Sequence, residues 1–217
     1  MTERLITITG KLNKQKLDYN IVASGSSGNA VRIENVMIDC GVPFKKLKDE
    51  LYDVDILLLT HIHTDHINKT TLKKIKEMFP YITIVGNYEI AHHNDVDIIC
   101  NTGYEFEVHG ISFEPFEVVH DVVTYGFKWE MKGNKIIYAT DTNNLDMIDK
   151  SERFDYMFIE SNHDELKIER AKANRGYDPK ISAMRHMSTQ KSKEFYFVHR
   201  VDKDSVWCEL HRSSKFY

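Results

Sequence analysis

The chain has 217 residues, 41% of them hydrophobic and 29% charged, and a formal net charge of −4. That apolar content can bury one sizeable core, and no linker or low-complexity tract divides the chain, so we expect one domain over residues 1–217. Three scattered cysteines without a CxxC pair argue against a disulfide framework, and the lack of a signal-like start or of an apolar run near the roughly 20 residues of a membrane span predicts a cytoplasmic protein that does not contact membranes.

The first quarter of the chain is predicted to form short strands. Runs rich in β-branched and apolar residues alternate with polar turn residues, which is typical of strands. The run before Thr60 is apolar enough to be a buried strand. We expect strands at 5–9, 18–22 and 54–59, a hairpin over 29–39 and a short helix over 43–51.

A serine- and glycine-rich loop follows the second of these strands. It runs from Ser24 to Asn29 and offers two glycines and three hydroxyls. Such a loop can present backbone N–H groups to an anion, although a plain turn has the same composition. Beside a metal site it would form a phosphate cradle, and we then expect Ser26, Ser27 and Asn29 to contact the substrate.

The segment after the buried strand concentrates metal-binding side chains. His61, His63, Asp65 and His66 have the spacing HxHxDH, which is far more specific than a lone histidine pair. Imidazole and carboxylate groups bind zinc, manganese or iron. Four donors exceed what one loop gives to a single four-coordinate ion. We therefore predict two neighbouring divalent ions, zinc or manganese.

The remainder of the chain mixes helices and strands. A helix over 68–79 would begin at Asn68 or Thr70, because its apolar residues share one face. Two sets of strands with helices between them predict two sheets packed face to face, an α/β (α+β) protein. We expect strands at 82–85, 96–99, 105–108, 111–114, 124–131, 135–139, 154–160, 195–199 and 206–211. We expect helices at 89–93, after the strand 154–160 as far as about residue 172, and at 181–187.

Charge is distributed unevenly along the chain. Residues 165–217 contain 12 Lys and Arg against 7 Asp and Glu, so the acidic excess lies in the preceding part. Bound divalent ions would cancel part of that acidic excess. A basic C-terminal quarter beside a metal site fits an anionic substrate such as a phosphodiester, but an ordinary solvated surface fits the charge equally well.

The HxHxDH segment resembles the signature of the metallo-β-lactamase superfamily, and the family's other motifs occur around it in the expected order. They match Asp39, His120, Asp141 and His186, each beside a predicted strand or late helix. The resemblance implies a four-layer αβ/βα sandwich of two mixed sheets flanked by helices. It also implies that Asp141 bridges the ions, with Asp39 hydrogen-bonded to the ligands. The implied ligands are His61, His63 and His120 for one ion and Asp65, His66 and His186 for the other.

A narrower resemblance concerns the WalJ (YycJ) branch, which is similar to 5′→3′ exonucleases on DNA. It is carried by residues 23–30 and by Ile159–Asp164. The chain departs from that branch at Arg185, Met187 and Asn143 and is shorter, so the metal site is a safer inference than the substrate.

Several further residues are candidates for the chemistry. Asp65, His163 and His199 are candidate catalytic groups, and Asn162 and Arg185 are candidate substrate contacts. For His163 and His199 a structural role is an equal alternative. The remaining histidines lack a motif and are predicted to be surface or structural residues: His92, His93, His109 and His211.

Four functions remain at this stage. A dinuclear metal-dependent nuclease acting on DNA is favoured by the Ser/Gly loop and the basic C-terminal quarter. A phosphodiesterase acting on a small substrate such as a cyclic nucleotide, and a thioester or lactone hydrolase, would use the same ligands. A binding module with a degenerate site is disfavoured by the complete ligand set. Assembly into a homodimer is left open.

Overall fold

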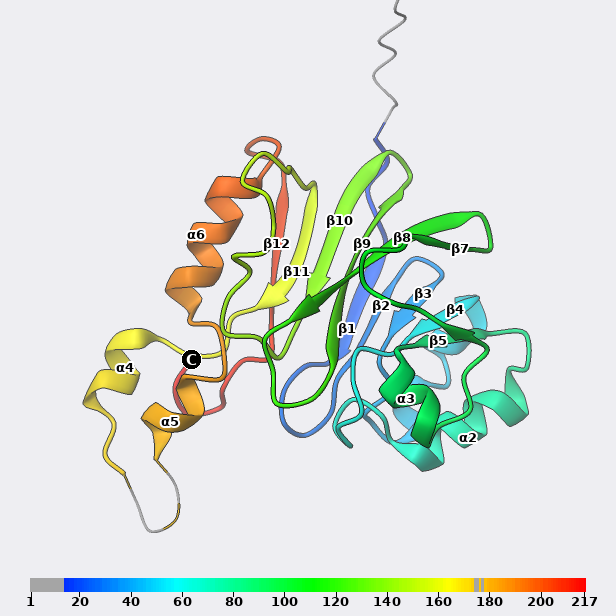
Figure 1. The fold of residues 1–217 in the computed structure, drawn as a ribbon, viewed down its shortest axis with the longest axis horizontal. Helices are drawn as coiled ribbons and strands as arrows, with labels where there is room; N and C mark the ends of the chain where they lie inside the picture. Colours follow the sequence, from blue (N-terminus) through cyan, green and yellow to red (C-terminus); the bar gives the residue numbers. More distant parts are fainter. Residues whose placement is uncertain (1–13, 174–175, 177) are drawn as a thin grey trace, which may run out of the picture.

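Two six-stranded sheets face each other in the protein (Figure 1). The computed structural model describes residues 14–173, 176 and 178–217, so the predicted strand at 5–9 lies outside the described residues. The first sheet has the order β1-β2-β3-β4-β5-β6, and the second has the order β12-β11-β10-β9-β8-β7. The prediction of two mixed sheets is confirmed.

The first sheet is built from the N-terminal half of the chain. Its first three strands are antiparallel neighbours, whereas β3 to β6 are parallel. The predicted hairpin turn at Glu34-Asn35 joins β2 to β3. The strands are β1 Tyr19–Ala23, β2 Ala30–Ile33, β3 Val36–Ile38, β4 Ile56–Leu58, β5 Thr83–Gly86 and β6 Ile98–Ile99.

The second sheet is antiparallel on one side and parallel on the other. The strands β7 to β10 form hairpins, and β10, β11 and β12 run parallel. Both hairpin turns have two residues with positive φ, His109-Gly110 and Lys132-Gly133, which suits the twist of the strands. The strands are β7 Phe106–Val108, β8 Ile111–Val118, β9 Thr124–Met131, β10 Asn134–Ala139, β11 Tyr156–Glu160 and β12 Val206–Leu210.

The helices form the outer layers of the sandwich. Most of them begin at a side-chain cap, as Asn68 shows by accepting a hydrogen bond from the Thr71 N–H. None of the helices in the described residues is long and apolar enough to cross a membrane. The helices are α1 Phe44–Leu47, α2 Lys69–Met78, α3 Tyr88–His93, α4 Glu165–Arg170, α5 Pro179–Ala183 and α6 Thr189–His199, with a 3-10 helix at Glu50–Asp53.

Three apolar clusters separate the four layers. The central one lies between the sheets and includes Ile38, Leu58 and Phe158. A second packs α2 and its neighbours on the outer face of the first sheet, and a third places Phe195 of α6 on the outer face of the second. The central strands, such as β4 with Ile56 and Leu58 on one side and Leu57 on the other, therefore divide their apolar side chains between two cores. The predicted αβ/βα sandwich is confirmed.

The predicted strand at 195–199 is wrong, because these residues complete α6. Ser188 caps the helix by accepting a hydrogen bond from the Lys191 N–H. Ser192, Phe195 and His199 are its buried residues, and their spacing of three and four is helical. The aromatic and β-branched content of this run favoured a strand, but the capped helical period and the packing on β11 outweigh it.

The sheets bring several loops to one edge of the sandwich. Because β3, β4, β10, β11 and β12 are parallel within their sheets, their carboxyl ends lie on the same side of each sheet. The antiparallel pairings of β1 and β8 turn their carboxyl ends the same way. The Ser/Gly loop, the HxHxDH segment and the later candidate residues follow these strand ends.

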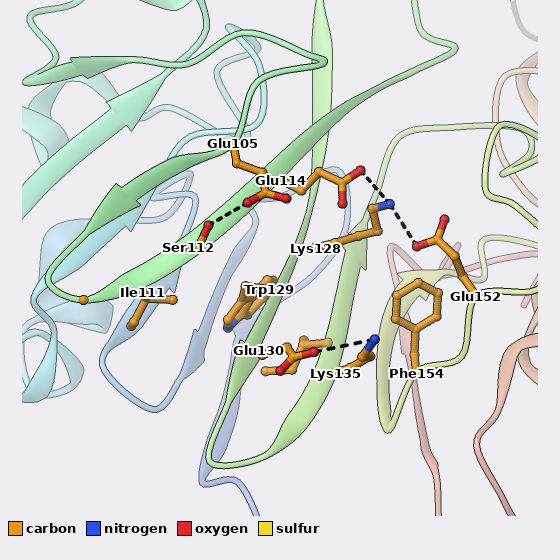
Figure 2. A pocket seen from close by; sticks show the side chains of 12 residues that line it. Glu105, Ile111, Ser112, Glu114, Lys128, Trp129, Glu130, Lys135, Glu152 and Phe154 are labelled. Atoms are coloured by element: carbon orange, nitrogen blue, oxygen red, sulfur yellow. Dashed lines mark hydrogen bonds and ion pairs between the residues drawn. The ribbon is translucent and has the colours of Figure 1, made fainter. Parts of the chain in front are cut away.

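The opposite ends of the second sheet carry a different, highly charged surface (Figure 2). Lys128 pairs with both Glu114 and Glu152, and Lys135 pairs with Glu130. The cavity there, about 420 Å³, contains none of the histidines of the HxHxDH segment. This charged cavity is therefore separate from the candidate site.

The loop at Gly41 lies so close to the backbone of Asp65 that a larger residue at position 41 should destabilise the fold. A Cβ on Gly41 would lie 1.7 Å from the Asp65 carbonyl oxygen, so Gly41→Ala should lower the free energy of unfolding by about 3 kcal/mol or more, the upper end of overpacking costs. Gly103→Ala is the control, because it has a φ of +80° but open space and should cost about 1–2 kcal/mol. Urea unfolding measures both, and equal costs would contradict the packing of these loops.

Candidate metal centre

The first group of candidate ligands joins β4 to the end of β8. His61, His63 and His120 each offer a ring nitrogen within 4.8 Å of the other two. His61 Nε2 lies 3.1 Å from His63 Nδ1, and His120 Nε2 lies 3.3 Å from the same atom. Thr60 Oγ1 contacts His61 Nδ1 at 3.0 Å, which turns the other nitrogen of that ring toward the group.

The second group lies deeper and includes the carboxylate of Asp141. His66 Nε2 lies 2.9 Å from Asp141 Oδ2, and the His66 Nδ1–H donates to Asp39 Oδ2 at 2.7 Å. His61 completes this group. Burial alone would lower the pKa of His66, but the two carboxylates outweigh burial and raise it to about 10. Asp39 also accepts from the Thr60 N–H, so it holds the start of the HxHxDH segment from the neighbouring strand, as expected.

A third group contains a histidine that the sequence analysis assigned to the surface or a structural role. Asp141, His186 and His211 have donor atoms within 4.8 Å of one another. His211 directly follows β12 and is buried, so the surface assignment is wrong. The buried Glu160 accepts from Nδ1 of both His186, at 2.7 Å, and His211, at 3.0 Å. Its other oxygen accepts from the Thr142 N–H.

Three residues in or beside these donor groups have an unusual backbone conformation. Asp39, Asp141 and His211 have φ values of 62°, 53° and 55°, in the left-handed region that ordinary residues seldom adopt. The other non-glycine residues with positive φ in the described chain are Glu34, His109 and Lys132, which are hairpin turn residues. Such strain costs on the order of 1–3 kcal/mol at each residue and is retained where it aims a functional side chain.

These residues fit divalent cations. Nitrogen atoms of three histidines converge within hydrogen-bonding distance, yet a neutral imidazole carries only one N–H. Burial lowers the pKa of His61 and of His120, which favours the neutral ring that binds metals. His120 Nδ1 is buried and has no hydrogen-bond partner in the part of the chain that the structure describes. Imidazole and carboxylate donors suit zinc or manganese.

Three of the five candidate substrate residues line a cleft of about 620 Å³ at this edge. Ser26, Ser27 and Asn162 line it together with His186 and His211. Asn29 has a different place: it is buried, and its amide contacts Gly25, the Asp65 carbonyl and His66 Nε2. Asn29 therefore positions the loop and the ligands rather than facing the cleft.

The other candidate residues are dispersed. Asp65 is half-buried and outside the three groups, and its carbonyl accepts from the Asn29 N–H. His186 lines this cleft and also an adjoining cavity of about 560 Å³. Arg185 is exposed and lines neither of them, whereas His163 lines the adjoining cavity. His199 stacks on Phe195 at the end of α6 and contacts the Glu152 carbonyl through Nδ1, so it has the structural role that was the alternative.

The fold and the histidine- and aspartate-rich site define the class of this protein as a metal-dependent hydrolase. The chain belongs to the β-lactamase superfamily, whose domain model matches residues 34–199. Its fold is similar to that of the metallo-β-lactamase fold protein YhfI from Bacillus subtilis, with a TM-score of 0.67 at 16% identity over 90% of this chain and 85% of that one.

Two curated relatives are nucleases by name. Exodeoxyribonuclease WalJ of Streptococcus pneumoniae serotype 2 is 29% identical over 172 residues, which are 67% of this chain and 62% of that protein. Ribonuclease Z of Agathobacter rectalis is 30% identical over 121 residues, which are 45% of this chain and 40% of that protein. The chain thus spans about three-fifths of the length of WalJ. The resemblance to the WalJ-like branch is confirmed.

Proposed function

We propose that the protein is a dinuclear metal-dependent phosphodiester hydrolase that acts on a polynucleotide, and that this polynucleotide is DNA. The observation that carries the proposal is the run of donor groups that share His61 and Asp141 and end at a cleft lined by hydroxyl and basic side chains. Arg212 and Lys215 line this cleft with Ser26 and Ser27, which suits a phosphate. The similarity to an exodeoxyribonuclease supports DNA.

The ligand assignment combines the three groups with Asp65, which belongs to none of them, and makes one change from the sequence analysis. His61, His63 and His120 would hold one ion, and Asp141, a member of two groups, would bridge. Asp65, His66 and His211 would serve the other. His211 replaces His186 here, because it is buried with its ring 6.5 Å from that of His66 and its Nδ1 3.7 Å from Asp141 Oδ1.

His186 is then free to act on the substrate. It is more exposed than His211 and lines both cavities beside the metal groups. Because its Nδ1–H donates to Glu160, its Nε2 is the atom that can exchange a proton with a substrate oxygen. Two bound cations would lower the pKa of a water toward neutrality and neutralise phosphoryl charge. The protein's own residues orient this chemistry: Asp39 and Glu160 hold the rings, and the Ser/Gly loop holds the phosphate.

The loop serines provide a test of substrate contact. Both are exposed at the cleft, so Ser26→Ala and Ser27→Ala should each raise KM by about 10-fold, the effect of one hydrogen bond to a charged group. Metal content should stay unchanged. Ser112→Ala is the matched control, because Ser112 lines the cavity at the opposite end of the second sheet (Figure 2). Unchanged kinetics in both loop variants would show that the loop is only a turn.

A substrate panel tests the proposed class. Protein loaded with Mn²⁺ or Zn²⁺ would be assayed on single-stranded DNA, double-stranded DNA, RNA, a cyclic nucleotide, bis(p-nitrophenyl) phosphate and a thioester. We expect DNA and bis(p-nitrophenyl) phosphate to be hydrolysed. Turnover of the cyclic nucleotide or the thioester without cleavage of any polynucleotide would overturn the proposal.

A further inference from the structure

A second cavity lies next to the cleft on the other side of His186. It has a volume of about 560 Å³ and shares Ile168, Ala183 and His186 with the cleft. It is open to solvent and is lined by residues of α4, of α5 and of the first turn of α6, three helices that lie near one another (Figure 1). A strand that passed His186 would therefore meet a binding space on each side.

His163 gives this cavity a polar group with an unused hydrogen-bonding atom. The residue follows β11 and is 6% exposed, and its Nδ1 is buried without a hydrogen-bond partner among the described residues. A buried N–H without an acceptor is costlier than a buried lone pair, so the proton belongs on Nε2. Since only Nδ1 is buried and unpaired, Nε2 is the ring nitrogen available to a ligand. Burial lowers the pKa of His163, which keeps this donor neutral.

Two lysines complete the cavity. Lys180 of α5 and Lys191 of α6 line it, and neither forms an ion pair within the part of the chain that the structure describes. Two carboxylates line it as well: Glu165 accepts a hydrogen bond from the Ser188 hydroxyl, and Glu169 is exposed. The groups left for a ligand include an imidazole N–H and two ammonium groups, which suit an anionic oxygen.

We infer that this cavity is a second nucleotide subsite, in which His163 Nε2–H, Lys180 and Lys191 bind the phosphate next to the scissile one. The inference rests on the proposed function and specifies its substrate: a chain of at least two phosphates, not a cyclic mononucleotide. It also gives His163 a different role from His199, because the ring of His199 has its packing neighbour and its hydrogen-bond partner inside the protein. His163 is a substrate-binding residue here.

Binding of a non-cleavable oligonucleotide tests the subsite. The metal-loaded protein would be titrated into a fluorescein-labelled thymidine octamer with phosphorothioate linkages, and Kd measured by anisotropy over a range of salt. Losing one phosphate contact should flatten the log–log slope of affinity against salt concentration by about 0.7. The Lys180→Ala/Lys191→Ala variant should therefore flatten this slope by about 0.7 or more. His163→Ala should weaken binding about 10-fold without changing the slope, because it removes a neutral donor. His163→Gln, which keeps an N–H donor, should recover most of the affinity.

Lys193→Ala is the matched control, because Lys193 is exposed on the same helix and lines neither cavity. Thermal unfolding of each variant distinguishes a loss of binding from a loss of folding. Both lysines are exposed, so we expect the double lysine variant to fold normally. If wild-type protein hydrolyses bis(p-nitrophenyl) phosphate but the subsite variants bind the octamer like Lys193→Ala, the subsite is refuted and the proposed hydrolase stands. If wild-type protein neither hydrolyses a phosphodiester nor binds the octamer, both are overturned.

Discussion

Asp141→Asn should abolish most activity and release at least one metal ion. Asp141 is the carboxylate shared by two of the three donor groups, and its pKa is held well below the ordinary value although burial opposes this, because His66, His211 and His61 surround it. Replacing a residue that hydrogen-bonds a metal ligand, without binding the metal itself, costs about 10–100-fold in activity or metal affinity. Loss of a bridging carboxylate should exceed about 100-fold. Elemental analysis and initial rates measure both effects.

A nearby aspartate supplies the control for this variant. Asp146 is exposed in the loop after β10 and belongs to none of the donor groups. Asp146→Asn should therefore keep full metal content and activity. Retention of all metal by Asp141→Asn would contradict the placement of the ions, whatever happened to the rate.

The two late histidines should differ in kind when each is replaced by alanine. His211→Ala should lose metal, because this buried ring lies beside both His66 and Asp141. His186→Ala should keep metal but lose about 100-fold or more in rate, the usual contribution of a positioned proton donor or acceptor. Both variants leave Glu160 with one histidine partner, so each controls for disturbance of that carboxylate.

Metal analysis and steady-state rates of the two variants are compared side by side. Metal loss from His186→Ala with retention in His211→Ala would restore the ligand set that the sequence resemblance implied. Equal metal loss from both would place both histidines on the ion and remove the proton-transfer role from His186.

Local sequence patterns predicted most of the strands and helices, whereas their arrangement as an αβ/βα sandwich came from the family resemblance. The alternating side chains and the turn residues of β7 to β10 are visible within a short stretch of sequence, and so are the Asn68 cap and the single apolar face of α2. The run 195–199 misled because aromatic and β-branched residues favour strands, whereas its helix is set by a cap at Ser188 and by packing on another element. Tertiary packing of this kind is not encoded in a short window.

The site was predictable where its donors are close in sequence. The HxHxDH spacing located His61, His63 and His66, which the structure brings together with His120 and Asp141. His211 was missed, because it has no neighbouring donor and is brought to Asp141 only by the parallel pairing of β12 with β11. A signal existed: His211 is the last residue of a predicted strand, near the end of the chain, and the proposed ligand set gives it the position that the resemblance gave to His186.

The central claim, that metals held by this histidine and aspartate cluster cleave a phosphodiester of DNA, is tested most directly by metal add-back. Protein stripped with a chelator would be assayed on an end-labelled DNA strand without metal, with Mn²⁺ and with Zn²⁺, with Asp141→Asn in parallel. We expect no cleavage by the stripped protein, recovery with at least one of the metals, and no recovery in the variant. Cleavage that survives stripping, or that returns equally in Asp141→Asn, would contradict the claim.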